Sequence, residues 1–261
     1  MTEISTITEL TPLTFLIVCP LVFLAGFVDS IGGGGGLISL PAYLFAGLPV
    51  HAAVGTNKLS SCLGTGTAAV RFARHGLIHW NLAVPTVIAA VIGSAIGAHV
   101  SLMMDEKVML ILLLCVLPAV AFAVMTKALH DHPKEEEVID MRAYVTATIA
   151  SFVIGIYDGI YGPGTGTFLI IALNIFSRLS IATANGQTKA INLATNITSL
   201  VVFLMNGTVI IPLGLAAALC NMAGAYIGSG MVMDKGSKIV RPIMIAVLVL
   251  LFIKVIGELV V

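Results

Sequence analysis

Long apolar segments recur along this chain, and they constrain its fold more than any other feature. A helix that crosses a bilayer needs about 20 consecutive, mostly apolar residues, and segments of this kind occupy most of the 261 positions. Only 10% of the residues are charged, whereas a soluble domain carries about 25%. The sequence therefore predicts an all-α polytopic membrane protein with the lipid bilayer as its surroundings.

The apolar segments form two sets of five, separated by one charged stretch. We expect a first transmembrane repeat at 1–126, a polar cytoplasmic linker at 127–142 and a second repeat at 143–261. The second segment of each set is too short to span a bilayer and predicts a re-entrant or broken helix, which leaves about four spanning helices per repeat. The segments are Leu13–Ile31, Leu37–Leu48, Val54–Ala73, Leu82–Met104 and Val108–Met125, followed by Ala143–Ile160, Phe168–Phe176, Ala184–Met205, Val209–Met233 and Val240–Val261.

The two sets are related in sequence. A shift of 131 positions aligns twelve identical residues without a gap, among them Lys58 with Lys189 and Gly93 with Gly224. Such a match indicates an internal duplication, and the glycines that recur four residues apart predict helix-packing faces. Arg71 follows the third segment of the first set, whereas the second set carries its basic residues after the fourth segment. By the positive-inside rule, the two repeats are therefore expected to be inverted.

Each repeat also contains a helix-breaking run that follows an aspartate. Asp29 precedes a run of five glycines, and Asp158 precedes a degenerate copy of that run. Paired breaks in the two halves of a membrane protein indicate a transport site, and the helix N-terminus after a break favours an anion. The alternative is that the glycines are only hinges or close-packing points. The candidate binding residues in the two runs are Gly33, Gly34, Gly35, Gly36, Gly164, Thr165, Gly166 and Thr167.

Lys58 and Lys189 lie near the start of long apolar segments. An intramembrane lysine costs about 3 kcal/mol on insertion scales, so it usually has a function or a partner; snorkelling to the interface is the alternative. Polar residues follow each lysine at three and seven positions, on the same helix face. They are Ser61 and Thr65 in the first repeat, and Asn192 and Asn196 in the second. We expect the lysines to neutralise a small anionic substrate, whose oxygens would be hydrogen-bonded by Thr56, Asn57, Gln187 and Thr188.

For Asp29 and Asp158, the sequence leaves a coupling role and a structural role open. They could pair with the lysines, orient the glycine loops or carry a coupling proton. The cysteines and histidines show no metal-ligand spacing and the net charge is zero, so we expect no metal, no cofactor and no nucleic-acid partner. A homodimer is one expected assembly. An anion channel and, less favoured, a membrane-embedded enzyme are the functional alternatives.

Three parts of the chain resemble the TauE/SafE family, the sulfite-exporter and sulfonate-permease group of membrane proteins. They are the run from Asp29 to Pro41, the segment from Ala53 to Lys58, and the run from Asp158 to Thr167. The resemblance implies a secondary transporter for a small organosulfur or related oxyanion of the sulfite, sulfonate, sulfoacetate or thiosulfate type. It also implies a multi-pass protein of a cytoplasmic (inner) membrane. Inverted repeats are the arrangement used for alternating access, and export is the expected direction.

Overall fold

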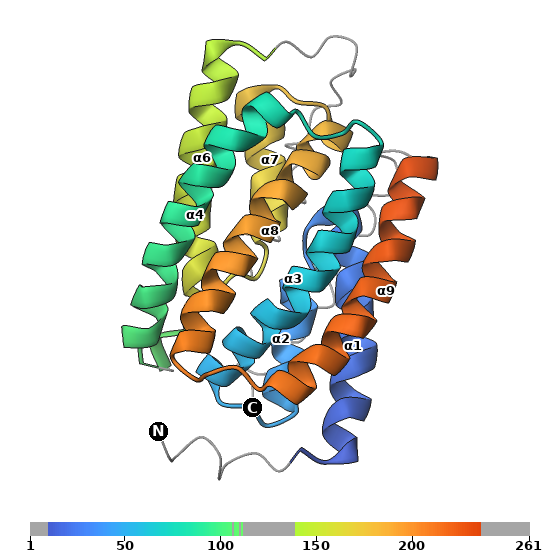
Figure 1. Cartoon of the computed structure of the whole chain (residues 1–261), viewed down its shortest axis with the longest axis vertical. Helices are drawn as coiled ribbons and strands as arrows, with labels where there is room; N and C mark the ends of the chain where they lie inside the picture. Colours follow the sequence, from blue (N-terminus) through green and yellow to red (C-terminus); the bar gives the residue numbers. More distant parts are fainter. Residues whose placement is uncertain (1–9, 106, 110, 112–138, 236–261) are drawn as a thin grey trace.

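The computed structural model describes residues 10–105, 107–109, 111 and 139–235. Every regular element in these ranges is an α-helix, and the long helices lie side by side along the long axis of the molecule (Figure 1). Five of these helices are long and apolar enough to cross a membrane, which confirms the prediction of an all-α, multi-pass membrane protein. They are α1 (Pro12–Gly32), α4 (Trp80–Met103), α6 (Met141–Ile160), α8 (Ile181–Met205) and α9 (Ile211–Lys235).

The remaining described helices are either short or polar. α3 (Val50–Arg74) is as long as the spanning helices, but it carries several buried polar residues. α2 (Gly36–Phe45) has 10 residues and α7 (Thr165–Ser177) has 13, so at about 1.5 Å per residue neither can cross a hydrocarbon core of about 30 Å. The two short helices were predicted. The fifth segment of each set, Val108–Met125 and Val240–Val261, falls wholly or largely outside the described residues.

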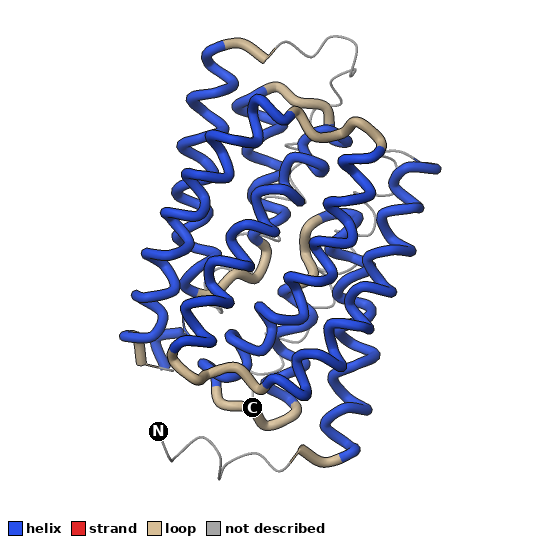
Figure 2. Tube along the Cα trace, viewed as in Figure 1, coloured by secondary structure: helices blue, strands red, loops and turns tan. Residues whose placement is uncertain are grey.

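The two short helices begin in the middle of the molecule, where the chain breaks (Figure 2). α1 stops because Gly33 adopts a left-handed backbone with φ 78°, and Gly164, just before α7, has φ 83°; glycine reaches this region without a steric penalty. The two loops also touch. A Cβ atom on Gly33 would lie 2.3 Å from the carbonyl carbon of Gly166, and the Thr167 N–H donates to the Gly33 carbonyl at 3.1 Å. The breaks therefore meet backbone against backbone.

The first helix of each half of the sequence packs against the fourth helix of the other half. α1 packs mainly against α9, and α6 packs mainly against α4. Equivalent glycines make both contacts close: a Cβ atom on Gly224 would lie 2.0 Å from the Phe23 carbonyl oxygen, and one on Gly93 would lie 2.3 Å from that of Phe152. Small residues of this kind let membrane helices approach closely. The predicted helix-packing role of these glycines is confirmed, and each glycine contacts a helix of the other half.

Candidate functional site

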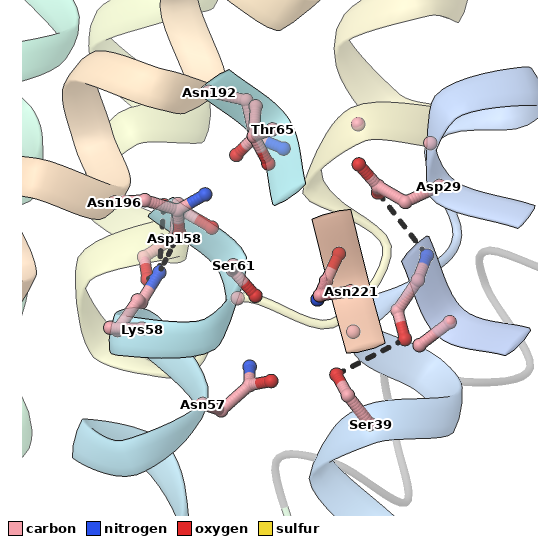
Figure 3. A pocket seen from close by; sticks show the side chains of 16 residues that line it. Asp29, Ser39, Asn57, Lys58, Ser61, Thr65, Asp158, Asn192, Asn196 and Asn221 are labelled. Carbon is pink, nitrogen blue, oxygen red and sulfur yellow. Dashed lines mark hydrogen bonds and ion pairs between the residues drawn. The ribbon is translucent and has the colours of Figure 1, made fainter. Parts of the chain in front are cut away.

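A small polar cavity lies between the two chain breaks, with a volume of about 30 Å³. Since a buried water needs about 10–15 Å³ in this measure, the cavity has room for about two waters. Figure 3 shows polar side chains converging on this space from helices of both halves. The polar lining consists of Asp29, Ser39, Asn57, Lys58, Ser61, Thr65, Asp158, Asn192, Asn196 and Asn221; glycines 33, 35, 36, 162 and 166 complete it with Ala25.

Lys58 is held by three oxygen atoms of the second half. Its Nζ lies 2.8 Å from Asp158 Oδ2, 2.7 Å from the Asp158 carbonyl oxygen and 3.3 Å from Asn196 Oδ1. An ammonium group has three donors, so this geometry can satisfy all of them. The side chains of Lys58 and Asp158 are only 2% and 3% exposed. The pair therefore joins α3 to α6 and α8 inside the protein.

Lys189 makes the equivalent contact to the first half. Its Nζ lies 2.9 Å from Asp29 Oδ2 and also donates to the Asp29 carbonyl oxygen. The other carboxylate oxygen, Asp29 Oδ1, accepts from the Gly35 N–H at 3.2 Å. Lys189 is fully buried, whereas the Asp29 side chain is 18% exposed. Asp29 therefore lies between Lys189 and the cavity, and Lys189 does not line the cavity itself.

The two pairs exclude the snorkelling interpretation of the lysines, since each ammonium group is buried against a carboxylate of the other half. Four formal charges result, and they sum to zero. The lysines therefore do not leave a net positive cavity; of the roles left open for Asp29 and Asp158, the structure shows pairing with the lysines. An arriving anion must compete with a carboxylate for the lysine, or it must bring a compensating charge, because burying an uncompensated charge is strongly unfavourable.

The two predicted polar stripes face each other. The hydroxyl groups of Ser61 and Thr65 on α3 and the carboxamides of Asn192 and Asn196 on α8 all line the cavity. Asn57 also lines it, and its Oδ1 is a buried atom for which no hydrogen-bond partner occurs among the described residues. These groups can donate hydrogen bonds to substrate oxygens without adding charge.

Other predicted binding residues have structural contacts instead. The Thr56 hydroxyl accepts from the Ile210 N–H at 3.0 Å, and Gln187 Oε1 accepts from the His79 N–H at 3.3 Å. Thr56 and Gln187 are equivalent under the 131-residue shift. Each accepts a hydrogen bond from a backbone N–H just before the fourth helix of the other half. Thr188 is buried and does not line the cavity. Gly34, Gly164, Thr165 and Thr167 also lie outside the cavity lining.

The loop amides that were expected to face an anion are partly engaged by the protein. The Gly33 N–H donates to the Asp29 carbonyl at 2.8 Å, and the Thr165 N–H donates to the Gly162 carbonyl at 3.2 Å. The Thr167 N–H donates to the Gly33 carbonyl in the first loop, and the Gly35 N–H donates to Asp29 Oδ1. In this conformation, the carboxylate of Asp29 therefore occupies one of the backbone donors that the sequence predicted for an anion.

Two polar side chains of the lining, those of Ser39 and Asn221, are not among the candidate residues predicted from the sequence. Asn221 lies on α9, where ideal Cβ atoms on Gly26 of α1 and Gly64 of α3 would be 2.5 Å and 1.8 Å from its Oδ1. The position equivalent to Asn221 in the first half is Ala90. An isolated carboxamide in an apolar segment, with alanine at the repeat-equivalent position, was the available sequence signal.

Comparison with known proteins places the chain among membrane transporters. The family model described as sulfite exporter TauE/SafE matches residues 18–255. The probable membrane transporter protein ORF9 of Sinorhizobium sp is 34% identical over 250 residues, which cover 94% of this chain and 93% of that protein. The probable membrane transporter protein YfcA of Escherichia coli K12 is 32% identical over 240 residues, covering 90% and 87%.

A more distant relative, the probable membrane transporter protein YdhB of Bacillus subtilis, is 26% identical over 219 residues, which cover 83% of this chain and 88% of that protein. No solved structure matches the chain. These names indicate a membrane transporter rather than an enzyme. With a family model that spans nearly the whole sequence, the chain belongs to the sulfite exporter TauE/SafE family.

Proposed function

We propose that the protein is a secondary transporter that moves a small sulfur oxyanion across the cytoplasmic membrane by alternating access. The substrates that fit this proposal are sulfite, simple sulfonates, sulfoacetate and thiosulfate, with export as the direction. One observation carries the proposal: two buried lysine–aspartate pairs join the two halves of the protein beside a polar cavity, at the level where two helices break.

The chemistry of the cavity favours a small, oxygen-rich anion. Lys58 faces the cavity, and hydroxyl and carboxamide groups supply neutral donors around it. The helices that follow the two breaks, α2 and α7, start at the centre of the molecule (Figure 2), and a helix N-terminus carries about half a positive charge. The lining offers no extended apolar surface, so a substrate with a long hydrocarbon chain does not fit the site.

The arrangement of the helices supports alternating access by inverted repeats. α1 begins at the lower end of the molecule in Figure 1 and α6 at its upper end, so the first helices of the two halves run in opposite directions. Their packing partners are exchanged in the same way, α1 with α9 and α6 with α4. Inverted repeats around a central site allow one half to rock against the other.

Basic residues support an orientation in the membrane. The last turn of α3 carries Arg71 and Arg74, and Arg142 lies in the first turn of α6. The C-terminal end of α3 and the start of α6 lie at the same end of the molecule, the upper end in Figure 1. By the positive-inside rule, we infer that this end faces the cytoplasm.

The test is flux in proteoliposomes that contain the purified protein. Preloaded vesicles should exchange internal for external labelled sulfite, thiosulfate and methanesulfonate, with saturation at high concentration, whereas chloride should compete poorly. Saturable counterflow distinguishes a carrier from a channel. Replacement of Asn192 by alanine, which removes a lining donor without touching either ion pair, should weaken substrate affinity by about tenfold, as expected for one lost hydrogen bond of roughly 1.4 kcal/mol.

The matched control is Asn206→Ala, since Asn206 is exposed at the end of α8 and lies outside the cavity. This variant should exchange anions like the wild type. Wild-type vesicles that exchange none of the three sulfur oxyanions would rule out the proposed substrate class. Exchange that is unaffected by Asn192→Ala would show that the substrate binds elsewhere.

A further inference from the structure

The two lysine–aspartate pairs occupy equivalent positions but have different surroundings. Asp158 is 3% exposed, and its partner Lys58 is also held by Asn196. Asp29 is 18% exposed and lies between the cavity and its partner Lys189. Of the two carboxylates, Asp29 is therefore the one that water and protons can reach more readily through the cavity.

The carboxylate of Asp29 is bound as a substrate anion would be. One of its oxygens lies 2.9 Å from the ammonium of Lys189, and the other accepts from the Gly35 N–H at 3.2 Å, next to the start of α2 at Gly36. An ammonium group together with backbone amides at a helix N-terminus is the donor set that oxyanions use. Asp29 thus fills this donor set itself.

The size of the cavity supports the same interpretation. At about 30 Å³ it holds about two waters, which is too little for an anion of four or more heavy atoms. A substrate fits only if a lining group moves, and the carboxylate of Asp29 is the group that already sits on anion donors.

We propose that Asp29 is the coupling-proton site and that its protonation opens the anion site, so that one proton and one oxyanion bind together. This inference rests on the proposed function and adds the coupling ion and its residue. The proton comes from water on the side to which the cavity is open and binds a carboxylate oxygen of Asp29. The neutral carboxyl group then releases Lys189 and the Gly35 N–H, and two substrate oxygens replace the carboxylate oxygens.

The charges balance only with the proton. The formal charges of Lys58, Lys189, Asp29 and Asp158 sum to zero, so a bound monoanion alone would leave one negative charge in the protein interior. Protonation of Asp29 restores neutrality. Because the anion and the proton move together, net flux follows their combined gradient, and export requires the substrate to accumulate inside the cell.

The groups that face Asp29 leave few other candidates for the proton. Lys189 reaches it from α8, while Lys58 on α3 and Asp158 on α6 lie across the cavity. The cavity linings from α2 and α9 are uncharged: Ser39 with glycines from the α2 side, and Asn221 from α9. Asp158 is the alternative proton acceptor, and its deeper burial and fixed contacts with Lys58 disfavour it.

The experiment uses full-length protein in proteoliposomes. The monoanion methanesulfonate is the probe for proton coupling, and the dianion thiosulfate is a second probe for exchange alone, since neither anion changes its charge in mildly acidic buffer. Wild-type vesicles should accumulate methanesulfonate when the outside is made acidic, by about tenfold per unit of pH difference at equilibrium for one coupled proton. The Asp29→Asn variant imitates the protonated residue. It should still exchange methanesulfonate between preloaded vesicles and buffer, but it should no longer accumulate the anion on a pH difference.

The control is Asp105→Asn, which neutralises an exposed aspartate after α4 and should behave like the wild type in both assays. Asp29→Asn leaves Lys189 without a counter-charge, so its melting temperature should rise more on addition of methanesulfonate than that of the wild type. Absence of this rise would contradict the inference. So would an Asp29→Asn protein that still accumulates the anion, or one that melts normally but does not exchange it.

Two outcomes separate this inference from the proposed function. Wild-type exchange of the probes without proton-driven accumulation would refute the role of Asp29 and leave the transport function intact. A wild-type protein that exchanges neither these probes nor sulfite would refute the transport function itself.

Discussion

Replacing Lys58 by methionine tests whether the Lys58–Asp158 pair is a buried, ionised pair. The two charged atoms are 2.8 Å apart, so their attraction is about 6 kcal/mol at an effective dielectric constant of 20. The desolvation of both groups offsets much of this attraction. Removal of one partner leaves the other charge buried and unpaired, which costs about 3–5 kcal/mol. We therefore expect Lys58→Met to destabilise the protein by about that amount.

The double variant Lys58→Met/Asp158→Asn isolates the charge effect. It contains no unpaired charge, so it should recover most of the lost stability while remaining inactive in sulfite exchange. The measurement is the melting temperature of purified protein in detergent, where about 2–4 °C corresponds to 1 kcal/mol for a chain of roughly this size. Lys58→Met should thus melt about 10 °C below the wild type, and the double variant much closer to it.

The control for the single and double variants is Lys107→Met. It removes an exposed lysine and should leave the melting temperature unchanged. The reasoning is refuted if Lys58→Met melts like the wild type, since a buried Asp158 carboxylate would then tolerate the loss of its partner. It is also refuted if the double variant is as unstable as the single one. In that case the loss of packing, rather than an unpaired charge, would cause the destabilisation.

Three further predictions concern the packing of α9 against α1, the polar cavity, and the hydrogen bond between Thr56 and the backbone before α9. Gly224→Ala places a Cβ atom 2.0 Å from a carbonyl oxygen of α1 and should reduce the free energy of unfolding by about 1–3 kcal/mol, measured as a lower melting temperature. The control Gly66→Ala, whose nearest contact would be 3.6 Å, should leave the melting temperature unchanged. Asn221→Asp adds a carboxylate to the cavity and should weaken sulfite binding at least about tenfold in isothermal titration, whereas Asn206→Asp at the exposed end of α8 should not. Thr56→Val leaves the N–H before α9 without its acceptor and should lower stability by about 1–3 kcal/mol in denaturant unfolding; unchanged unfolding would contradict the structural role given to this hydroxyl.

Local sequence carried most of the information about the helices. Segment length and apolar content are properties of short stretches, so the long helices and the short α2 and α7 could be predicted within a few residues. The breaks at Gly33 and Gly164 were also predictable, because left-handed backbone favours glycine. The polar stripes behind Lys58 and Lys189 follow from helical spacing alone, and both stripes line the same cavity.

The pairing between the halves could not be predicted from local sequence. Lys58 and Asp158 are 100 positions apart, and Lys189 and Asp29 are 160 apart, so their contacts depend on how the repeats pack. The duplication related the two lysines to each other but did not assign their partners. For the same reason a positively charged site was expected around the lysines, whereas in the packed protein each lysine is neutralised by an aspartate.

The roles of single polar residues required the tertiary structure as well. Thr56 and Gln187 stand beside the lysines in sequence, yet their side chains bind the backbone of loops in the opposite half. Asn221 is far from the glycine runs in sequence, but α9 brings it into the cavity. Position next to a charged residue is therefore a weaker guide to the site than the helix face on which a residue lies.

The exchange of helices between the halves has a consequence for how the protein is made. Asp29 enters the membrane 160 positions before Lys189 has been synthesised, and at about 5–20 residues per second this delay lasts on the order of 10–30 s. During that time the first half holds a carboxylate, a lysine and a bare glycine loop without their final partners. A chain truncated before α8 therefore keeps Asp29 without its lysine, and we expect such a chain to be destabilised by the unpaired charge.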